Sequence, residues 1–217
     1  MNKLPATEVE TASPRATYQD VLDAPPHKVA EVVDGTLYTH PRPAPPHAVA
    51  STGLGGLLNQ TFQFGRGGPG GWWIIIEPEL HLDEDIVVPD IAGWRRERMP
   101  QLPNAAFFTL APDWVCEVLS PSTRTLDLGG KRAVYAREGV SYLWFLDPIA
   151  RSLEAYELRG KEWVLIDTLF EDASVSLPPF EAIRFDLGDL WPPRVVHKDV
   201  PSESKTESEP ELTEATK

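Results

Sequence analysis

The stretch Val87 to Trp94 reads Val-Val-Pro-Asp-Ile-Ala-Gly-Trp, and the stretch Trp114 to Leu119 reads Trp-Val-Cys-Glu-Val-Leu. Such short apolar runs, bounded by turn-forming residues, predict buried strands, here over residues 86–94 and 113–120. Each run contains a single acid, Asp90 in the first and Glu117 in the second. A carboxylate is costly to bury unless a cation or a hydrogen-bond donor faces it. The two lone acids together therefore predict that both strands bring a carboxylate to one cation.

For one acid alone, a solvated strand end or an arginine partner would be a sufficient explanation. For the pair, a divalent metal is the better explanation, because Mg²⁺ prefers oxygen ligands and is typically bound by one or two carboxylates together with water and substrate phosphate. A third expected strand, over residues 72–82, places Glu77 and Glu79 on one face and adds two candidate ligands. The five histidines include no pair at zinc-ligand spacing, so no zinc site is expected.

The other segments around these strands predict an α+β fold with one sheet and helices packed against it. Helical spacing and end signals, among them Thr17 as the cap of the first helix, predict helices. An Asp34-Gly35 pair and a glycine at position 160 predict two hairpin turns. Cys116, next to Glu117, points to the other face and is expected to be a small buried apolar residue. The expected elements are helices over 17–23, 47–64 and 126–138, a hairpin over 31–38, a strand over 142–147 and a hairpin over 153–169.

The chain has 217 residues, which is enough for one well-packed domain, expected over residues 17–192. Residues 1–16 and 193–217 are rich in Ser, Thr, Pro and Glu and are expected to be disordered. The formal net charge of −13 argues against indiscriminate attraction to nucleic acid or anionic membranes. The sequence contains neither an apolar run of about 20 residues nor a secretory leader, and it has a single cysteine, so a cytoplasmic protein without a membrane partner is expected.

The quoted motifs resemble those of the restriction-endonuclease family of Uma-two type in the PD-(D/E)XK nuclease superfamily. The resemblance covers about residues 17–191 and includes the string Glu-Val-Leu-Ser-Pro-Ser-Thr at 117–123. It implies a single restriction-endonuclease-like domain, a mixed β-sheet flanked by α-helices, in which Asp90 and Glu117 hold Mg²⁺ or Mn²⁺ and act on DNA. Further matching segments are Glu31–Leu37, Pro46-His47, Lys131, Tyr135–Val140 and Leu143–Pro148.

The sequence departs from the superfamily motif at Leu119, where a lysine is expected two residues after the acid. The resemblance implies that the catalytic lysine comes instead from the following helix, as Lys131. Helical spacing independently places Lys131 on the apolar stripe of that helix. The alternatives are a lysine that extends to solvent, or one that pairs with Asp127 four residues earlier. Glu31 and Glu79 are weaker candidates for completing the metal shell.

Two smaller predictions concern the surroundings of this site. Basic residues near the two acid-bearing strands are expected to form a positive rim around the site. Such a rim would provide local attraction for nucleic acid on a protein whose net charge is negative. His47 is either a helix cap or a residue that faces the site, and the hydroxyls of Ser120 to Thr123 are expected to cap the following helix. The basic residues are Arg95, Arg96, Arg98, Arg124, Lys131, Arg132 and Arg137.

Together these observations predict a Mg²⁺-dependent endonuclease that hydrolyses phosphodiester bonds, with DNA as the nucleic-acid partner and Asp90, Glu117 and Lys131 as catalytic residues. Leu119 and the acidic charge leave open a catalytically inactive binding protein on the same scaffold. Seven tryptophans and paired acids leave open a carbohydrate-active enzyme, although most of these tryptophans fall in apolar runs typical of a core. Symmetric nucleases often act as dimers, so a homodimer is an expectation by analogy alone.

Overall fold

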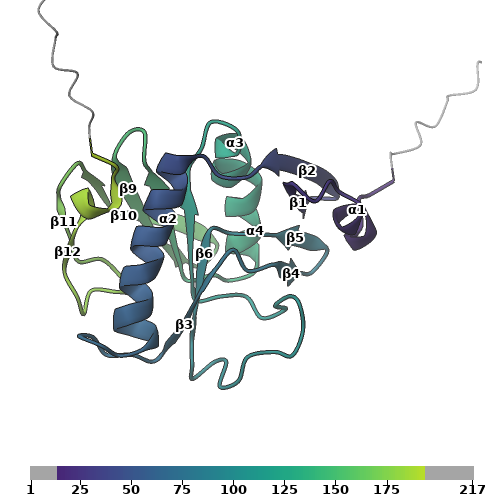
Figure 1. Cartoon of the computed structure of the whole chain (residues 1–217). Helices are drawn as coiled ribbons and strands as arrows, with labels where there is room; N and C mark the ends of the chain where they lie inside the picture. The colour runs from purple at the N-terminus through teal and green to yellow at the C-terminus, as the bar shows by residue number, and fades with distance from the viewer. Residues whose placement is uncertain (1–13, 194–217) are drawn as a thin grey trace, which may run out of the picture.

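A mixed six-stranded sheet, in the order β10-β9-β8-β7-β6-β3, forms the centre of the computed structural model, which describes residues 14–193 (Figure 1). Its neighbouring strands run antiparallel except for β7 and β8, which are parallel and joined by the helical segment between them. Its strands are β3 (Trp72–Ile76), β6 (Ile91–Arg95), β7 (Trp114–Val118), β8 (Tyr142–Asp147), β9 (Ser152–Arg159) and β10 (Glu162–Phe170).

A second, antiparallel sheet has the order β2-β1-β5-β4, and a two-stranded sheet pairs β11 with β12. The predicted α+β class is confirmed, but the expected single sheet is wrong. The strands of the smaller sheets are β1 (Lys28–Val33), β2 (Thr36–Pro41), β4 (Leu80–Leu82), β5 (Asp85–Val87), β11 (Ser174–Val175) and β12 (Phe185–Asp186).

The additional sheet arises because two predicted strands are each broken in the middle. The run 72–82 divides into β3 and β4 at Glu77, whose φ of 47° is left-handed and ends the extended strand. The run 86–94 divides into β5 and β6 around Pro89, which has no N–H to donate to a sheet ladder. The Glu77 N–H donates to the Asp90 carbonyl over 3.0 Å, so the two breaks lie side by side. After each break the chain passes from one sheet to the other.

The helices agree more closely with the expected ranges. The short first helix begins with the capping box predicted at Thr17, and the 126–138 helix forms with a π-helical turn in its first half. Both predicted hairpins form, and Asp34 and Gly35 adopt the positive φ angles of their turn. The helical elements are α1 (Tyr18–Leu22), α2 (Pro45–Leu58), η1 (Asn59–Gln63), α3 (Arg124–Leu126), η2 (Asp127–Lys131), α4 (Arg132–Arg137) and η3 (Leu187–Leu190).

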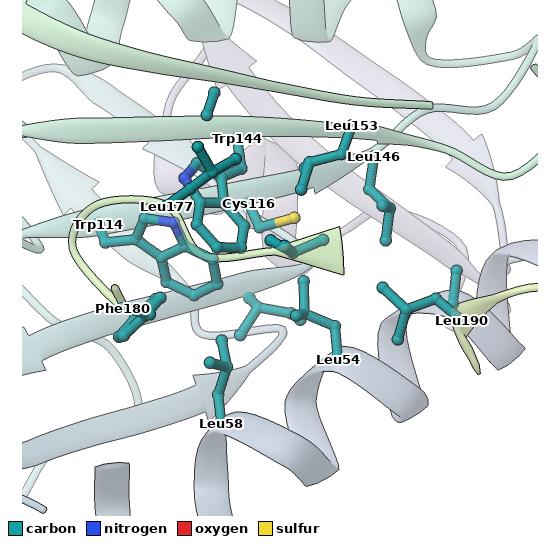
Figure 2. Close-up of a cluster of buried hydrophobic side chains, with 14 of the residues drawn as sticks. Leu54, Leu58, Trp114, Cys116, Trp144, Leu146, Leu153, Leu177, Phe180 and Leu190 are labelled. Atoms are coloured by element: carbon teal, nitrogen blue, oxygen red, sulfur yellow. The ribbon is translucent and has the colours of Figure 1, made fainter. Parts of the chain in front are cut away.

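Each face of the six-stranded sheet has its own hydrophobic core. On one face, α2 and the C-terminal segment cover a cluster that includes Trp114, Cys116 and Trp144, with Phe180 packed against the indole rings (Figure 2). On the other face, α4 and the four-stranded sheet cover a cluster that includes Trp94 and Tyr135. Cys116 is buried, as expected. Because five tryptophans are buried, they do not supply the exposed stacking surface that motivated the carbohydrate alternative; they are Trp72, Trp94, Trp114, Trp144 and Trp191.

The predicted disordered ends fall almost entirely on residues 1–13 and 194–217, which lie outside the described residues. Within the described range, Arg15 and Ala16 are attached to the β1–β2 turn, although they were assigned to the disordered N-terminal segment. The Ala16 N–H donates to the Gly35 carbonyl over 2.8 Å, and Arg15 pairs with Glu84 at 2.9 Å. No helix within residues 14–193 is long and apolar enough to cross a membrane.

Candidate active site

The pairing of β6 with β7 brings the two lone acids together. The strands are antiparallel with Ile91 opposite Cys116. Asp90 precedes Ile91 and Glu117 follows Cys116, so the two acids are neighbours across the strand pair. The Val118 N–H donates to Asp90 Oδ2 over 2.7 Å, which fixes the Asp90 carboxylate directly beside the Glu117 main chain. The sequence-based expectation that two strands bring their acids to one place is therefore met by the strand register.

Lys131 reaches this point from the C-terminal end of the π-helical turn η2. Its side chain is 3% exposed, and Nζ lies 2.9 Å from Glu117 Oε1 and 3.0 Å from Glu31 Oε1. Nζ also donates to the Val88 carbonyl over 3.2 Å and lies 3.4 Å from Asp127 Oδ1. The lysine is therefore placed at the acids, as the resemblance implied, and it also makes the Asp127 contact that was the alternative. It does not extend to solvent.

Glu31 holds Lys131 from the side of β1. Its Oε1 accepts a 2.7 Å hydrogen bond from the Val88 N–H, and its Oε2 lies 2.9 Å from His40 Nε2. With Lys131 on Oε1 as well, both carboxylate oxygens are engaged and the side chain is fully buried. Glu31 does not line the cavity described below. The structure thus brings this predicted metal ligand to the site as a partner of the lysine.

Tyr135, one helical turn after Lys131, completes the environment of Glu117. Its buried hydroxyl donates to Glu117 Oε1 over 2.5 Å, the same oxygen that Lys131 contacts. Within residues 14–193 the other oxygen, Oε2, has no hydrogen bond, and it is not fully enclosed by protein atoms. Because Glu117 lines the cavity, Oε2 is the oxygen that is available there. Two donors on one carboxylate oxygen thus orient the other toward an incoming group.

The pKa values of this buried cluster reflect burial first and the charges of the neighbouring groups second. Burial raises the pKa of Glu117 well above its usual range; Lys131 opposes this, while Asp127, Asp90 and Glu31 add to it. Burial likewise raises the pKa of Asp127 against the influence of Lys131. Burial alone would lower the pKa of Lys131, but Glu117 and Glu31 hold it well above its ordinary value. Lys131 is therefore charged, and the cluster favours the arrival of further positive charge.

His47, near the start of α2, faces the site and does not cap the helix. Its Nε2 lies 3.1 Å from Asp90 Oδ1, whereas the cap position of α2 is Ala44. Burial would lower the pKa of His47, but its hydrogen bond to Asp90 and the charges of Asp90 and Asp127 raise it. Its Nδ1 is enclosed and has no hydrogen-bond partner within the described range. The second of the two readings left open by the sequence is the one the structure supports.

These groups open onto a cavity of about 210 Å³. Its polar floor is formed by Asp90, Glu117, Asp127 and Lys131, and the residues around them come from the β2–α2 connection and from the segment 120–123. Glu77 also lines this cavity, but Glu79 does not; Glu79 is bound to His81 at 2.7 Å. Of the acids considered as additional ligands, the cavity therefore receives Glu77, and the expected contribution of Glu79 has no support in this geometry.

The prediction of a positive rim around the site is wrong: of the basic residues expected to form it, Lys131 alone lines the cavity. Arg95, Arg96 and Arg98 follow the end of β6 opposite to Asp90, where Arg95 and Arg96 lie over tryptophan rings and Arg98 pairs with Asp113. Arg124 pairs with Asp147, and Arg137 pairs with Asp85. Among the described lining residues, the lysines and arginines of the cavity are Lys131 and Arg42. The direction of the β6 strand separates its acid from its arginines, a fact that the sequence order alone does not reveal.

Comparison with solved structures identifies the class of fold. A crystal structure described as that of "a putative nuclease belonging to DUF820 from Anabaena variabilis ATCC 29413" matches with a TM-score of 0.66 and 23% sequence identity. The match covers 81% of this chain and 97% of the other. The two proteins share a fold, and it is the fold of a protein described as a nuclease.

Sequence comparison then gives the family. The Uma2 family model, described as "Putative restriction endonuclease", matches residues 15–188. The chain belongs to the Uma2 family, which confirms the resemblance inferred from the motifs. No similar sequence is found among curated proteins.

Proposed function

We propose that the protein is a nuclease that hydrolyses phosphodiester bonds in DNA with the help of Mg²⁺ or Mn²⁺. The observation that carries the proposal is the convergence of Asp90 and Glu117 with the buried Lys131 at the floor of one cavity. Family membership and the fold of the structural neighbour support a nuclease in general. The metal and the choice of DNA are the proposal's own additions.

The residues present fit a magnesium-type ion. Within residues 14–193 no group of three or more histidine, cysteine or carboxylate side chains is arranged to hold a metal. A site of two carboxylates, with water and substrate phosphate in the remaining positions, does not need such a group. Asp90 and Glu117 would be the ligands, because they are adjacent, line the cavity and belong to a cluster with excess negative charge. When bound, the ion would activate water and stabilise charge on the phosphate oxygens.

The protein's own groups have separable roles in this proposal. Lys131 is held in its charged form and binds Glu117 through Oε1, which leaves Oε2 for an incoming ion. Glu31 fixes Lys131, and it is itself fixed by Val88 and His40. The ammonium of Lys131 also lies where it can stabilise the negative charge that develops during phosphodiester hydrolysis. We therefore assign Lys131 to charge stabilisation and Glu31 to positioning.

The test is cleavage of labelled single-stranded DNA, duplex DNA and RNA in Mg²⁺, in Mn²⁺ and in chelator. We expect cleavage of DNA in either metal, none in chelator, and a fall to background in Asp90→Asn. Asp167→Asn is the matched control, because Asp167 is an exposed acid on β10, outside the cavity. Cleavage by Asp90→Asn at the wild-type rate, or undiminished cleavage in chelator, would contradict the mechanism.

A catalytically inactive binding protein is the second candidate, and two observations favour it. The amine of Lys131 is already engaged by carboxylates and by a carbonyl, and Leu119 occupies the position where the superfamily motif has lysine. This alternative predicts no cleavage of any substrate. Calorimetry then separates a metal-binding scaffold from a metal-free one: Mg²⁺ binding that is lost in an Asp90→Ala, Glu117→Ala double variant would show that the carboxylate pair still holds an ion.

A further inference from the structure

The lining of the site cavity contains more acids than bases, and such a lining would repel the negatively charged phosphodiester of a substrate. Its lining includes four acids, Glu77, Asp90, Glu117 and Asp127. Lys131 is 3% exposed, and its ammonium is engaged by Glu117, Glu31, Asp127 and the Val88 carbonyl. A substrate phosphate that enters the cavity therefore needs another cation at the mouth.

Arg42 is that cation. It follows β2 directly, lines the cavity, and has a side chain that is 59% exposed. Its ion-pair contact within residues 14–193 is to Glu77 Oε2 at 3.8 Å, which is too long for a hydrogen bond. The guanidinium is thus accessible and free to form the bidentate contact that arginine makes with phosphate.

Arg42 also lines a second hollow, of about 390 Å³. The two hollows share Val29, Arg42, Glu77 and Val88 as lining residues, so they adjoin each other. The second hollow lies between α1 and β1, where α1 packs beside the β1–β2 hairpin (Figure 1).

The second hollow has an apolar wall. Leu22, Pro25 and Pro26 line it, and Leu22 is 58% exposed although it is a large hydrophobic residue. Lys28 adds a second cation to this lining, beside the two acids Glu77 and Glu79. A ligand that occupies both hollows would place a phosphate near Arg42 and an apolar or aromatic face next to Leu22 and the two prolines.

We propose that the second hollow is the subsite for the unpaired nucleotide next to the scissile phosphodiester, with Arg42 bound to the adjoining phosphate. This inference rests on the proposed nuclease function and deepens it. A base can contact Leu22 and the two prolines only when its face is free, whereas in a duplex both faces are stacked on neighbouring bases. The preferred substrate is accordingly a single strand or an unpaired end, and Arg42 and Leu22 are residues that bind it.

The experiment measures binding by fluorescence anisotropy, with a labelled 12-nucleotide single strand and a hairpin duplex as probes, in chelator and in Ca²⁺. We expect the single strand to bind more tightly than the duplex. We expect Arg42→Gln to weaken single-strand binding about tenfold, the effect of losing a charged hydrogen bond, with a shallower salt dependence. Arg42→Lys is expected to recover part of the loss, and Leu22→Glu to weaken binding as well.

Two variants of exposed residues outside both hollows serve as matched controls. Arg66→Gln removes an arginine that lies over Phe64, and Leu165→Glu changes a 51% exposed leucine on β10. Both are expected to bind as the wild type does. Melting curves verify folding, and Arg42→Gln is expected to melt like the wild type because the side chain is exposed. Equal binding by Arg42→Gln and Arg66→Gln, or equal affinity for single strand and duplex, would overturn the subsite.

The failure of this inference can be told apart from failure of the nuclease function. If Asp90-dependent cleavage is found but Arg42→Gln and Leu22→Glu change neither affinity nor KM, the subsite is wrong and the nuclease stands. If single-strand binding depends on Arg42 and Leu22 but no substrate is cleaved, the subsite stands and the nuclease is wrong. When both hold, Arg42→Gln is expected to raise KM with little change in kcat.

Discussion

Lys131 is the residue on which the stability of the site depends, because a single ammonium lies among three buried or nearly buried carboxylates. It contacts Glu31, Glu117 and Asp127 within 3.4 Å. The attraction of Lys131 opposes the effect of burial on the pKa of each of these acids. Removal of the lysine would leave burial and mutual repulsion unopposed, and both favour the protonated form of the acids.

We expect Lys131→Met to lower the free energy of unfolding by about 3–5 kcal/mol near pH 8 and by less near pH 5. The folded-state pKa values of Glu117 and Asp127 are already raised, and without Lys131 they rise further, while Glu31 loses one of the contacts that lower its pKa. A group with a raised folded-state pKa contributes stability at low pH and loses it as pH rises through that pKa. Urea unfolding at the two pH values measures the difference. Lys161→Met, in the β9–β10 turn, is the control, and a pH-independent loss in Lys131→Met would refute the electrostatic account.

At the scale of elements, the π-helical turn η2 places Lys131, and a glycine permits its close approach to β1. A Cβ atom on Gly130 would lie 2.8 Å from Val33 Cγ1, whereas a Cβ atom on Gly129 would meet nothing within 4 Å. Val33 is buried in the core on that side of the sheet and has a short, branched side chain, so it has little freedom to move aside. The distance between η2 and β1 is therefore set by the absence of a side chain at position 130.

We expect Gly130→Ala to lower the free energy of unfolding by about 1–3 kcal/mol, as overpacking does. Gly129→Ala is the matched control on the same turn, and it is expected to leave stability unchanged or to raise it by up to about 1 kcal/mol, since alanine favours helix. Denaturant unfolding measures both. Equal stabilities for the two variants would mean that η2 can move away from β1 without cost, contrary to the packing argument.

For the molecule as a whole, a net charge of −13 and a buried acidic cluster would both be offset by a bound cation. We expect Mg²⁺ or Mn²⁺ to raise the melting temperature of the wild type, because an ion that binds only the folded state stabilises it by about 2.7 kcal/mol at 100 times its dissociation constant. Differential scanning fluorimetry measures the shift, with KCl of matched ionic strength as the control. Asp90→Asn is expected to lose the shift, and an unchanged shift in that variant would place the ion elsewhere.

The sequence alone predicted most elements, because short-range signals determine them: the Thr17 cap, the Asp34-Gly35 turn, and the apolar runs that became strands. It also predicted that Asp90 and Glu117 meet, since a lone acid in an apolar strand needs a partner. The breaks at Glu77 and Pro89 were not predicted, although Pro78 and Pro89 are signals for them, because apolar residues resume after each proline. Only the pairing of β4 and β5 in another sheet reveals where each strand ends.

The orientation of side chains around the site was decided by the tertiary structure. Tyr135 could have been found from its position four residues after Lys131, and His47 was already a candidate near the start of its helix, but neither position identifies a partner. Glu31 binds the lysine, Glu79 lies outside the cavity, and Arg42 lines it, because the pairing of β1 with β2 and β5, and of β5 with β4, sets where these residues lie. Local sequence determines which residues form a strand or helix, whereas contacts between residues far apart in the chain depend on how all the elements pack together.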